Sequence, residues 1–253
     1  MSRKPTLSPS RISTYLACPT KYRWTFLDRR GRYFMRSRSY YSFGISLHKV
    51  LERFHDAQDA GVETVSEALA ALEESWLEAG YDSAQEMDEA LNEGRLIIES
   101  YVERQVAAKR DAKTLFCEHR MKLDLGEFDL VGQLDRVDEL ADGTIEVIDY
   151  KSGRETVTPT DIQTDLAMSC YQLMMRHQFP GRRVQATIVA LRSGVEASYS
   201  LTDQEAEVFR QDLVFIGGQM LNREWEFVVP TRKGLCERCE FVPLCRKYED
   251  WGE

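Results

Sequence analysis

The sequence predicts an α/β (α+β) fold in which helices flank a mixed β-sheet. Three observations support this prediction: residues 1–112 have mainly helical periodicity, three β-like runs follow up to residue 151, and a helical run then precedes another apolar strand. Such an order is typical of a sheet with antiparallel and parallel pairs. We expect one domain over residues 1–253, with a helical insertion at 62–112 and the sheet within 113–224.

The N-terminal region is predicted to be helical. Ser8 is a favourable N-cap and Pro9 suits a first helical turn, so a helix should begin there and end at Cys18-Pro19. A second helical run is expected over residues 20–28, and a loop rich in Arg, Ser and Tyr should follow it to Tyr41.

A longer helix is predicted over residues 42–60, where Gly61 would stop it. Residues 62–112 predict two more helices, interrupted near residues 80–83. Acidic residues dominate this insertion, so we expect it to face away from any nucleic acid. The apolar stripes of the three helices contain, in order, Leu47, Val50, Leu51 and Phe54; Leu69, Leu72, Trp76 and Leu77; and Leu91, Leu96, Ile97, Tyr101 and Val102.

The β-region is predicted to be a three-stranded meander, and its second turn contains Asp142-Gly143, a strong hairpin signal. The expected strands are Leu115–Leu125, Phe128–Leu140 and Thr144–Lys151. A helix over Asp161–Phe179, a buried strand over Val184–Leu191, an edge strand over Glu196–Leu201 and a helix over Thr202–Asn222, capped by Thr202, should follow.

The composition is that of a globular protein, with 43% hydrophobic and 30% charged residues. No run approaches the ~18 apolar residues of a membrane span, and the N-terminus lacks the apolar core of a secretory signal. We therefore expect a cytoplasmic protein. In that compartment the six cysteines are expected to be free thiols or metal ligands rather than disulfides.

Positive charge is concentrated at the N-terminus. The net charge is −9, yet residues 1–40 carry +9 and the remainder −18. A basic segment on an acidic protein suggests a local anionic partner, although a solvated charged surface is the simpler alternative. Aromatic residues interleaved with the Lys and Arg residues favour nucleic acid as the partner, because nucleobases stack on aromatic rings. Several of these aromatic residues should belong to the core. These aromatic residues are Tyr15, Tyr22, Trp24, Phe26, Tyr33, Phe34, Tyr40 and Tyr41.

The hairpin over residues 132–153 carries the first candidate site. Side chains alternate along a strand, so Asp149 and Lys151 share a face and Tyr150 lies on the other. Asp135, on the partner strand, could reach the same place. Two carboxylates crowded together are unfavourable unless a cation neutralises them, so the hairpin predicts a metal site.

The second candidate site consists of cysteines. Cys236, Cys239 and Cys245 follow a Cys-x2-Cys-x5-Cys pattern, which indicates a metal site or cluster, and Cys18 is the natural fourth ligand. The spacing is compatible with zinc or with an iron–sulfur cluster. Unrelated buried cysteines are the alternative, and that reading fits Cys117 and Cys170 better.

Together these motifs resemble the PD-(D/E)XK nucleases of the RecB and CRISPR-associated exonuclease type, including the iron–sulfur subgroup shared with AddB-type proteins. The matching segments are Leu7–Pro19, Gly44-x3-His48, Gly132-x2-Asp135-Arg136, Ile148-Asp149-Tyr150-Lys151 and the terminal cysteines. They span nearly the whole chain, and the complete set is far more specific than any one motif. The resemblance implies a restriction-endonuclease-like sheet and a metal-dependent nuclease.

The resemblance also implies roles for individual residues. Asp135 and Asp149 would bridge Mn²⁺ or Mg²⁺, His48 and the backbone carbonyl of Tyr150 would be further ligands, and Lys151 would orient the attacking water. Judged alone, His48 fits a packed or surface histidine and Lys151 a surface residue. Other acids of the sheet are weaker candidates: Glu118 could contribute, whereas Asp138 and Glu146 are expected to be solvated.

One motif departs from the family pattern. The helix after the lysine usually carries Gln-x3-Tyr, which contacts substrate or positions catalytic groups. Here Tyr171 is present but Ala167 stands at the glutamine position. Gln163 or Gln172 could replace it, or the contact could be lost, and Tyr171 could also be a core residue.

The resemblance implies a [4Fe–4S] cluster held by Cys18, Cys236, Cys239 and Cys245, with zinc as the alternative. Such a cluster would join a basic segment at residues 1–41 to a cysteine segment at 230–253. We expect a single-stranded DNA exonuclease of repair, recombination or CRISPR adaptation, with a helicase or CRISPR integrase complex as a further partner. The rival hypothesis is a non-catalytic DNA-end-binding scaffold.

Overall fold

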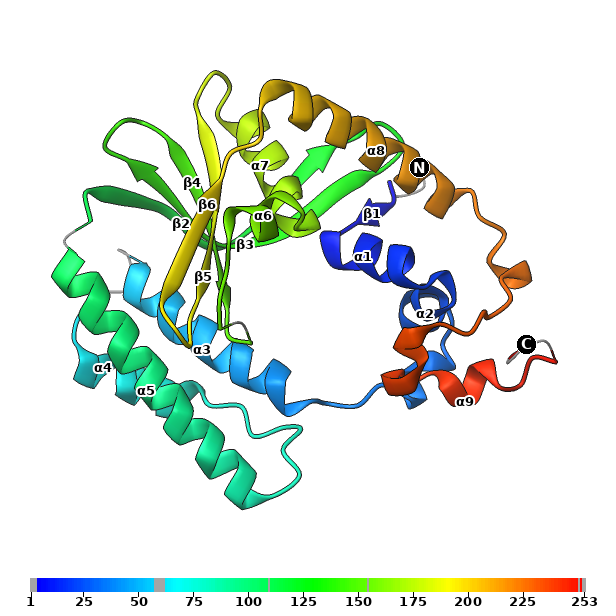
Figure 1. Ribbon diagram of the computed structural model, residues 1–253, viewed down its shortest axis with the longest axis horizontal. Coiled ribbons are helices and arrows are strands. Elements are labelled where there is room, and N and C mark those ends of the chain that lie inside the picture. Colours follow the sequence, from blue (N-terminus) through cyan, green and yellow to red (C-terminus); the bar gives the residue numbers. More distant parts are fainter. Residues whose placement is uncertain (1–3, 57–61, 109, 154, 250, 252–253) are drawn as a thin grey trace. The chain divides into compact units, whose positions relative to one another are not determined.

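The computed structural model describes residues 4–56, 62–108, 110–153, 155–249 and 251 (Figure 1). The chain divides into two compact units. We call residues 37–123 and 131–210 the sheet unit, and residues 1–36, 124–130 and 211–253 the terminal unit. A single domain over residues 1–253 stays a prediction.

The β-sheet has the order β1-β3-β4-β5-β6, and β2 also pairs with β3. The pairs β3–β4 and β5–β6 are antiparallel, whereas β1–β3 and β4–β5 are parallel. The predicted meander and the mixed sheet are therefore confirmed. The strands are β1 (Thr6–Leu7), β2 (Ala112–Asp124), β3 (Asp129–Leu140), β4 (Ile145–Lys151), β5 (Val184–Ala190) and β6 (Val195–Tyr199).

The helices are distributed over the two units. They are α1 (Pro9–Ala17), α2 (Pro19–Tyr22), α3 (Ser39–His55), α4 (Val65–Ser75), α5 (Ala84–Ala108), α6 (Pro159–Gln163), α7 (Leu166–Gln178), α8 (Asp203–Leu221) and α9 (Val242–Cys245). Short 3-10 turns lie at Gly31–Tyr33, Trp225–Phe227 and Gly234–Arg238. No helix among the described residues is long and apolar enough to cross a membrane.

Several predicted helix boundaries are confirmed and others are wrong. Ser8 caps α1, accepting a hydrogen bond from the Arg11 N–H, and α4 and α5 form the predicted pair of the insertion. The second helical run is confirmed as α2 followed by a π-helical turn at Arg23–Leu27, whereas α3 begins at Ser39, three residues before its predicted start. The predicted stop at Gly61 and the basic residue Arg3 lie outside the described residues.

The single helix predicted over Asp161–Phe179 is wrong, because α6 and α7 are separate. The chain breaks at Thr164-Asp165, where Asp165 caps α7 by accepting hydrogen bonds from the N–H groups of Ala167 (2.9 Å) and Met168 (3.1 Å). A side chain that caps the second helix competes with continuation of the first. Within the insertion, Leu96 is 67% exposed and does not join the predicted apolar stripe.

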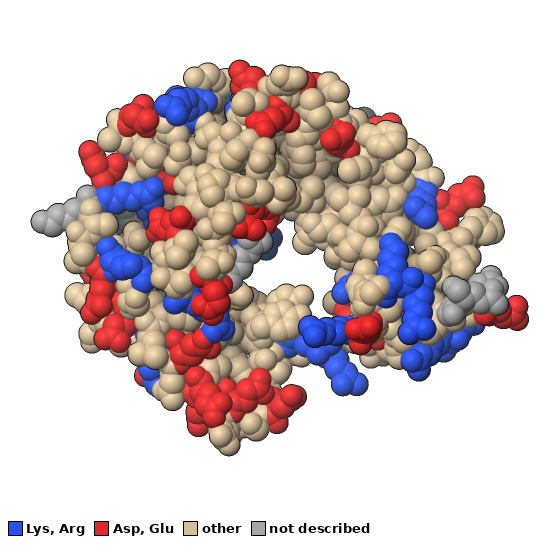
Figure 2. Space-filling model, viewed as in Figure 1, with Lys and Arg blue, Asp and Glu red and all other residues tan. Residues whose placement is uncertain are grey.

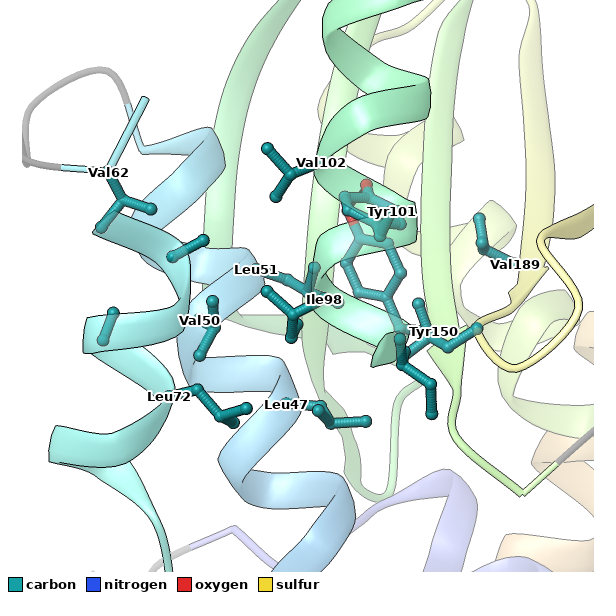
Figure 3. Close-up of a cluster of buried hydrophobic side chains, with 14 of the residues drawn as sticks. Leu47, Val50, Leu51, Val62, Leu72, Ile98, Tyr101, Val102, Tyr150 and Val189 are labelled. Carbon is teal, nitrogen blue, oxygen red and sulfur yellow. Dashed lines mark hydrogen bonds between the residues drawn. The ribbon is translucent and has the colours of Figure 1, made fainter. Parts of the chain in front are cut away.

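The sheet unit has an apolar core on each face of β4 and β5. Side chains of α3, α4 and α5 pack on Tyr150 of β4 and Val189 of β5 (Figure 3). Met168 of α7 packs against Ile188 of β5 on the other face. Alternation therefore places Tyr150 against α3 and α5 and leaves Asp149 on the opposite side of the strand.

Asp138 and Glu146 are buried, so the prediction that they are solvated is wrong. Asp138 is 0% exposed and forms an ion pair with Arg136, and Glu146 is 1% exposed and forms one with Arg110. Thr187 also donates a hydrogen bond to Glu146 (2.5 Å). Buried carboxylates are tolerated when they are paired and hydrogen-bonded, as these are.

The terminal unit brings the two ends of the chain together. Trp24 packs with Phe241, Leu244 and Cys245 in a small apolar cluster. Lys233 donates a hydrogen bond to the Ala17 carbonyl (3.0 Å) at the end of α1. Figure 2 shows Lys and Arg gathered over the α2 and α9 region of this unit, and Asp and Glu gathered over α4 and α5 of the sheet unit.

Candidate metal centre

His48 reaches the sheet from α3. Its Nε2 donates a hydrogen bond to the backbone carbonyl of Tyr150 (3.0 Å), which directs Nδ1 toward two carboxylates. Nδ1 lies 3.5 Å from Asp135 Oδ1 and 3.6 Å from Glu118 Oε1. Gly44, one turn earlier on α3, allows this approach, because a Cβ there would lie 3.2 Å from Ser152 Oγ beyond β4.

The β3–β4 hairpin supplies two acids to this region. Asp135 and Asp149 each lie one residue beyond the last ladder pair, Arg136 with Ile148. The Tyr150 N–H donates a hydrogen bond to Asp135 Oδ2 (2.9 Å), which leaves Oδ1 directed toward His48. Asp149 is 6% exposed and forms an ion pair with Lys151 through Oδ2 (2.6 Å).

Glu118 on β2 completes a set of three ligand groups. The ligand atoms of His48, Glu118 and Asp135 all lie within 4.8 Å of one another, and no other group of three or more His, Cys, Asp or Glu in the described ranges does so. Glu118 has φ +45°, the sole positive value found for a non-glycine residue in the described chain. Such a conformation is strained and persists where surrounding structure enforces it, often at functional sites.

From the sequence alone, Glu118 is only a weak candidate for a site residue. No local pattern marks it, because its position depends on the pairing of β2 with β3. The one signal that could have identified it is the presence of an acid on the strand before Asp135. The structure brings Glu118 to His48 and Asp135, and places Asp149 beside them in an ion pair with Lys151.

Electrostatic shifts reflect the crowding of negative charge. Burial alone would lower the pKa of His48, but hydrogen bonds to Asp135 and Glu118 outweigh it and raise the pKa to about 10. Burial, followed by repulsion from Asp135, raises the pKa of Asp149 to about 6. Without a metal, the protonated imidazole therefore supplies the positive charge between the carboxylates.

Lys151 remains cationic in this environment. Burial acts to lower its pKa, but the Asp149 carboxylate more than compensates and the pKa is raised. The ammonium can therefore donate hydrogen bonds and stabilise negative charge, but it is a poor proton acceptor.

A cavity of about 410 Å³ adjoins the set of ligands. Its walls include His48 and Glu118, and Lys49 on α3 adds a cation to its rim. The remaining lining residues are Gly44, Ile45, Glu52 and Gln133. Sequence reasoning did not identify Lys49 or Gln133, because each is one of many surface polar residues until the strands are paired.

Comparison with known proteins identifies the family. The family model of the PD-(D/E)XK nuclease superfamily matches residues 6–246. The chain belongs to this superfamily. A search of curated proteins found no match.

Solved structures resemble this PD-(D/E)XK nuclease in fold. One is a protein from Eubacterium rectale named "Putative exonuclease", which superposes with a TM-score of 0.53 at 12% identity, covering 99% of this chain and 90% of that one. At this identity the match shows the fold alone. A second solved structure, SSO0001, is 11% identical, and the match covers 98% of this chain and 88% of that one. Its TM-score of 0.33 is too low to show a shared fold.

Tyr171 of the nuclease faces the acids from α7. Burial, and then the charges of Asp149 and Asp135, raise its pKa. A Cβ at position 132 would lie 2.8 Å from Tyr171 Cε1, so Gly132 permits the tyrosine to approach β3. The structure thus places Tyr171 beside Asp149 and Asp135 and explains the glycine of the Gly132-x2-Asp135 motif.

Neither alternative glutamine reaches the acids. Gln172 is 0% exposed, and its Oε1 accepts a hydrogen bond from the Leu201 N–H (2.8 Å). Gln163 lies on α6 and donates a hydrogen bond to the Tyr199 hydroxyl (2.9 Å). Both side chains are directed to β6 and the segment after it, so the usual glutamine contact has no substitute from these two residues.

All six cysteines are free, and four of them belong to the terminal unit. Backbone N–H groups donate to two of the sulfurs, from Lys21 to Cys18 (3.4 Å) and from Lys233 to Cys236 (3.3 Å). Burial raises the pKa of the Cys245 thiol, as do the nearby Cys239, Cys18 and Cys236, while the Trp24 indole lowers it. The four side chains therefore influence one another, although no three of the described sulfurs lie within 4.8 Å.

Proposed function

We propose that this PD-(D/E)XK nuclease is a metal-dependent DNA exonuclease that prefers single strands. The observation that carries the proposal is the convergence of His48, Glu118 and Asp135 beside the Asp149–Lys151 ion pair. Together they provide ligands for a cation and an ammonium next to them, the combination that phosphodiester hydrolysis requires.

The ligand set fits Mn²⁺ or Mg²⁺. Carboxylate oxygens bind both ions, and the His48 imidazole favours Mn²⁺. His48 Nδ1 faces both carboxylates, while Nε2 is held by the Tyr150 carbonyl, as is usual for a metal-ligating histidine. Asp149 and the Tyr150 carbonyl are proposed as further ligands. The bound ion would lower the pKa of water and offset charge on the phosphate.

The remaining residues orient the reactants. Lys151 keeps its proton, so we assign it to hydrogen bonding of the attacking water and stabilisation of the phosphoryl oxygens. Tyr171 is proposed to contact the substrate from α7, the role its position beside Asp149 allows. Asp149 holds the lysine in place through their ion pair.

The preference for single strands rests on exposed aromatic residues. Tyr40 and Tyr41 are 62% and 61% exposed at the start of α3, with ring centroids 4.3 Å apart. Tyr41 precedes His48 by two turns of the same helix, with Ile45 between them. Unpaired bases can stack on such rings. Tyr15, Tyr22 and Trp24 of the predicted basic segment are instead buried, while Tyr33 is 74% exposed.

We further propose that Cys18, Cys236, Cys239 and Cys245 bind a [4Fe–4S] cluster that joins the two ends of the chain. The indole N–H of Trp24 is buried beside the Cys245 sulfur, and its hydrogen bonding lowers the pKa of that thiol. A cluster thiolate or sulfide would accept this hydrogen bond. Tetrahedral zinc held by the same four thiolates is the alternative.

The cluster proposal is tested by anaerobic purification. We expect a brown protein whose visible absorption bleaches in air and whose iron content falls in Cys239→Ala. A colourless protein containing stoichiometric zinc would overturn the cluster and leave the nuclease proposal intact.

The rival function is a non-catalytic DNA-end-binding scaffold. Only the alanine at position 167, where the family usually has glutamine, favours it. Whether the enzyme serves general repair and recombination beside a helicase, or CRISPR adaptation beside an integrase complex, would be decided by its genomic neighbours and by co-purification.

The nuclease proposal is tested with end-labelled single-stranded DNA and Mn²⁺ under anaerobic conditions. We expect stepwise degradation that disappears in Asp149→Ala and Lys151→Ala. Equal activity in the wild type and both variants would reveal a contaminant and contradict the proposal. Binding without cleavage would support the scaffold.

A further inference from the structure

The backbone of Tyr150 connects two of the proposed metal ligands. Its N–H donates to Asp135 Oδ2 (2.9 Å) and its carbonyl accepts from His48 Nε2 (3.0 Å). One peptide segment of β4 therefore sets where the Asp135 carboxylate and the His48 ring lie. Any displacement of Tyr150 would move both ligands.

The side chain of Tyr150 points away from this site into a buried polar network. Its hydroxyl lies 3.0 Å from the hydroxyl of Tyr101 on α5 (Figure 3). It also lies 3.4 Å from Arg136 Nη1. His55 Nε2 lies 2.8 Å from Arg136 Nη1 and 2.7 Å from the Tyr101 hydroxyl. Asp138 holds the guanidinium through Nε (2.7 Å) and Nη2.

The chemistry of the side chains determines which groups donate and which accept in this network. Arg136 can only donate, so His55 Nε2 accepts from it and is unprotonated. The pKa of His55 is lowered by burial and then by repulsion from Arg136, which agrees with an unprotonated Nε2. The Tyr101 hydroxyl also lies within hydrogen-bond distance of Nε2, so it shares the single lone pair of that nitrogen with Arg136, and it can accept from Tyr150. The Tyr150 hydroxyl in turn accepts from Arg136.

We infer that this network, made of Arg136, Asp138, His55, Tyr101 and Tyr150, positions the metal ligands from the opposite face of β4. The inference rests on the proposed metal site. None of the side chains of Arg136, His55 or Tyr101 is proposed to touch the metal or the substrate, so each acts as a positioning residue. The network fixes the Tyr150 ring, the ring fixes its peptide groups, and these fix Asp135 and His48.

The test uses tyrosine hydroxyls, because their removal leaves the apolar packing in place. Tyr101→Phe and Tyr150→Phe each interrupt the network. Tyr81→Phe is the matched control, since its hydroxyl is buried without a hydrogen-bond partner among the described residues and its ring stacks on Trp76. Asp135→Asn reports whether the metal site itself exists.

Mn²⁺ affinity is measured by electron paramagnetic resonance, at a temperature at which every variant is folded. We expect Tyr101→Phe and Tyr150→Phe to weaken Mn²⁺ binding about tenfold and to alter the spectrum of the bound ion, as loss of supporting hydrogen bonds does elsewhere. The double variant should resemble either single variant, since both break one connected network. Tyr81→Phe should bind as the wild type does.

Two results would overturn the inference in different ways. Wild-type affinity and spectrum in both network variants, even with lowered melting temperatures, would show that the network only stabilises the fold. Absence of Mn²⁺ binding by the wild type, or unchanged binding by Asp135→Asn, would contradict the metal site itself and with it the positioning role.

Discussion

Two polar clusters lie on opposite faces of β4, and their charges are arranged differently. The network face pairs one guanidinium, Arg136, with one buried carboxylate, Asp138, and surrounds them with hydroxyl groups and a neutral imidazole. The metal face gathers the acids Glu118, Asp135 and Asp149 around Lys151 and His48. In the first cluster the charges of Arg136 and Asp138 cancel, and all partners are protein groups. In the second cluster the negative charge of the carboxylates is neutralised only when the histidine is protonated or a cation is bound.

We propose that this difference separates groups that stabilise the fold from groups that serve chemistry. Buried ionic groups with matched partners keep their protonation states and hold the chain in one arrangement. Groups crowded with like charge have shifted pKa values and bind cations, the signature of a functional site. Substitutions on each face of β4 test this distinction.

Loss of either half of the Asp149–Lys151 pair should abolish activity without unfolding the protein. We expect Asp149→Asn and Lys151→Met to lower the nuclease rate by about a thousandfold or more, since each removes charge stabilisation at the reacting phosphate. The rate on single-stranded DNA checks this, with circular dichroism as the control for folding. Rates within tenfold of wild type would place the chemistry elsewhere.

On the network face, Arg136→Met should be costly to stability. It leaves the Asp138 carboxylate buried without its cation, which should lower the free energy of unfolding by about 3–5 kcal/mol. Adding Asp138→Leu should recover part of that loss, because no unpaired charge then remains. Urea unfolding measures both variants, and a double variant less stable than Arg136→Met would contradict this view of the pair.

A substitution at Gly132 should have a smaller effect on the free energy of unfolding. Gly132→Ala would bring a Cβ 2.8 Å from the Tyr171 ring, so we expect a loss of about 1–3 kcal/mol in unfolding free energy. In Gly132→Ala/Tyr171→Leu the penalty should diminish, since the clashing ring is gone. Chemical denaturation tests this, and an equal penalty in both backgrounds would point to backbone strain instead.

Metal binding should depend on pH through the metal face alone. The raised pKa values of Asp149, about 6, and His48, about 10, mean that the folded metal-free protein retains protons which the unfolded chain loses. These two groups therefore reduce stability as pH rises through their folded pKa values. Mn²⁺ competes with the same protons, so its stabilisation should be larger near pH 8 than near about pH 5.

Thermal unfolding with and without Mn²⁺ across this range measures the effect. In His48→Gln/Asp149→Asn the gain in melting temperature from Mn²⁺ should be small and nearly independent of pH. A gain in the wild type that does not change with pH would contradict the assignment of these groups.

The exposed tyrosines should contribute modestly to substrate binding. Tyr41→Ala should weaken binding of single-stranded DNA by about 1–3 kcal/mol, the value typical of one stacked base, and Tyr41→Phe should retain it. Fluorescence anisotropy with Ca²⁺ in place of the catalytic ion provides the affinities. Leu96→Ala, a change at an equally exposed residue of the acidic insertion, is the control. Equal affinities for all four proteins would exclude stacking on Tyr41.

The sequence predicted those parts of the structure that depend on local rules. The β3–β4 hairpin followed from alternation and from the Asp-Gly turn, where the Gly143 N–H donates to the Leu140 carbonyl (2.8 Å). The break between α6 and α7 was also local, since Asp165 is a good N-cap, but helical periodicity on both sides concealed it.

Other features depend on residues distant in sequence and could not be predicted locally. Burial of Asp138 depends on its pairing with Arg136 below α5, and burial of Glu146 depends on Arg110 and Thr187. His48 was found only because its motif resembles that of a family. Glu118 has no such motif, and its place beside His48 follows only from the positive φ and the strand pairing.

The most direct test of the central claim is the location of Mn²⁺ in crystals of the protein. An anomalous difference map from crystals soaked in MnCl₂ should show a peak bonded to His48 Nδ1 and to carboxylate oxygens of Asp135 and Glu118, at about 2.0–2.3 Å. No peak is expected among Arg136, Asp138 and His55 on the other face of β4. A map with no peak at His48, or with its strongest peak elsewhere in the sheet unit, would contradict the account.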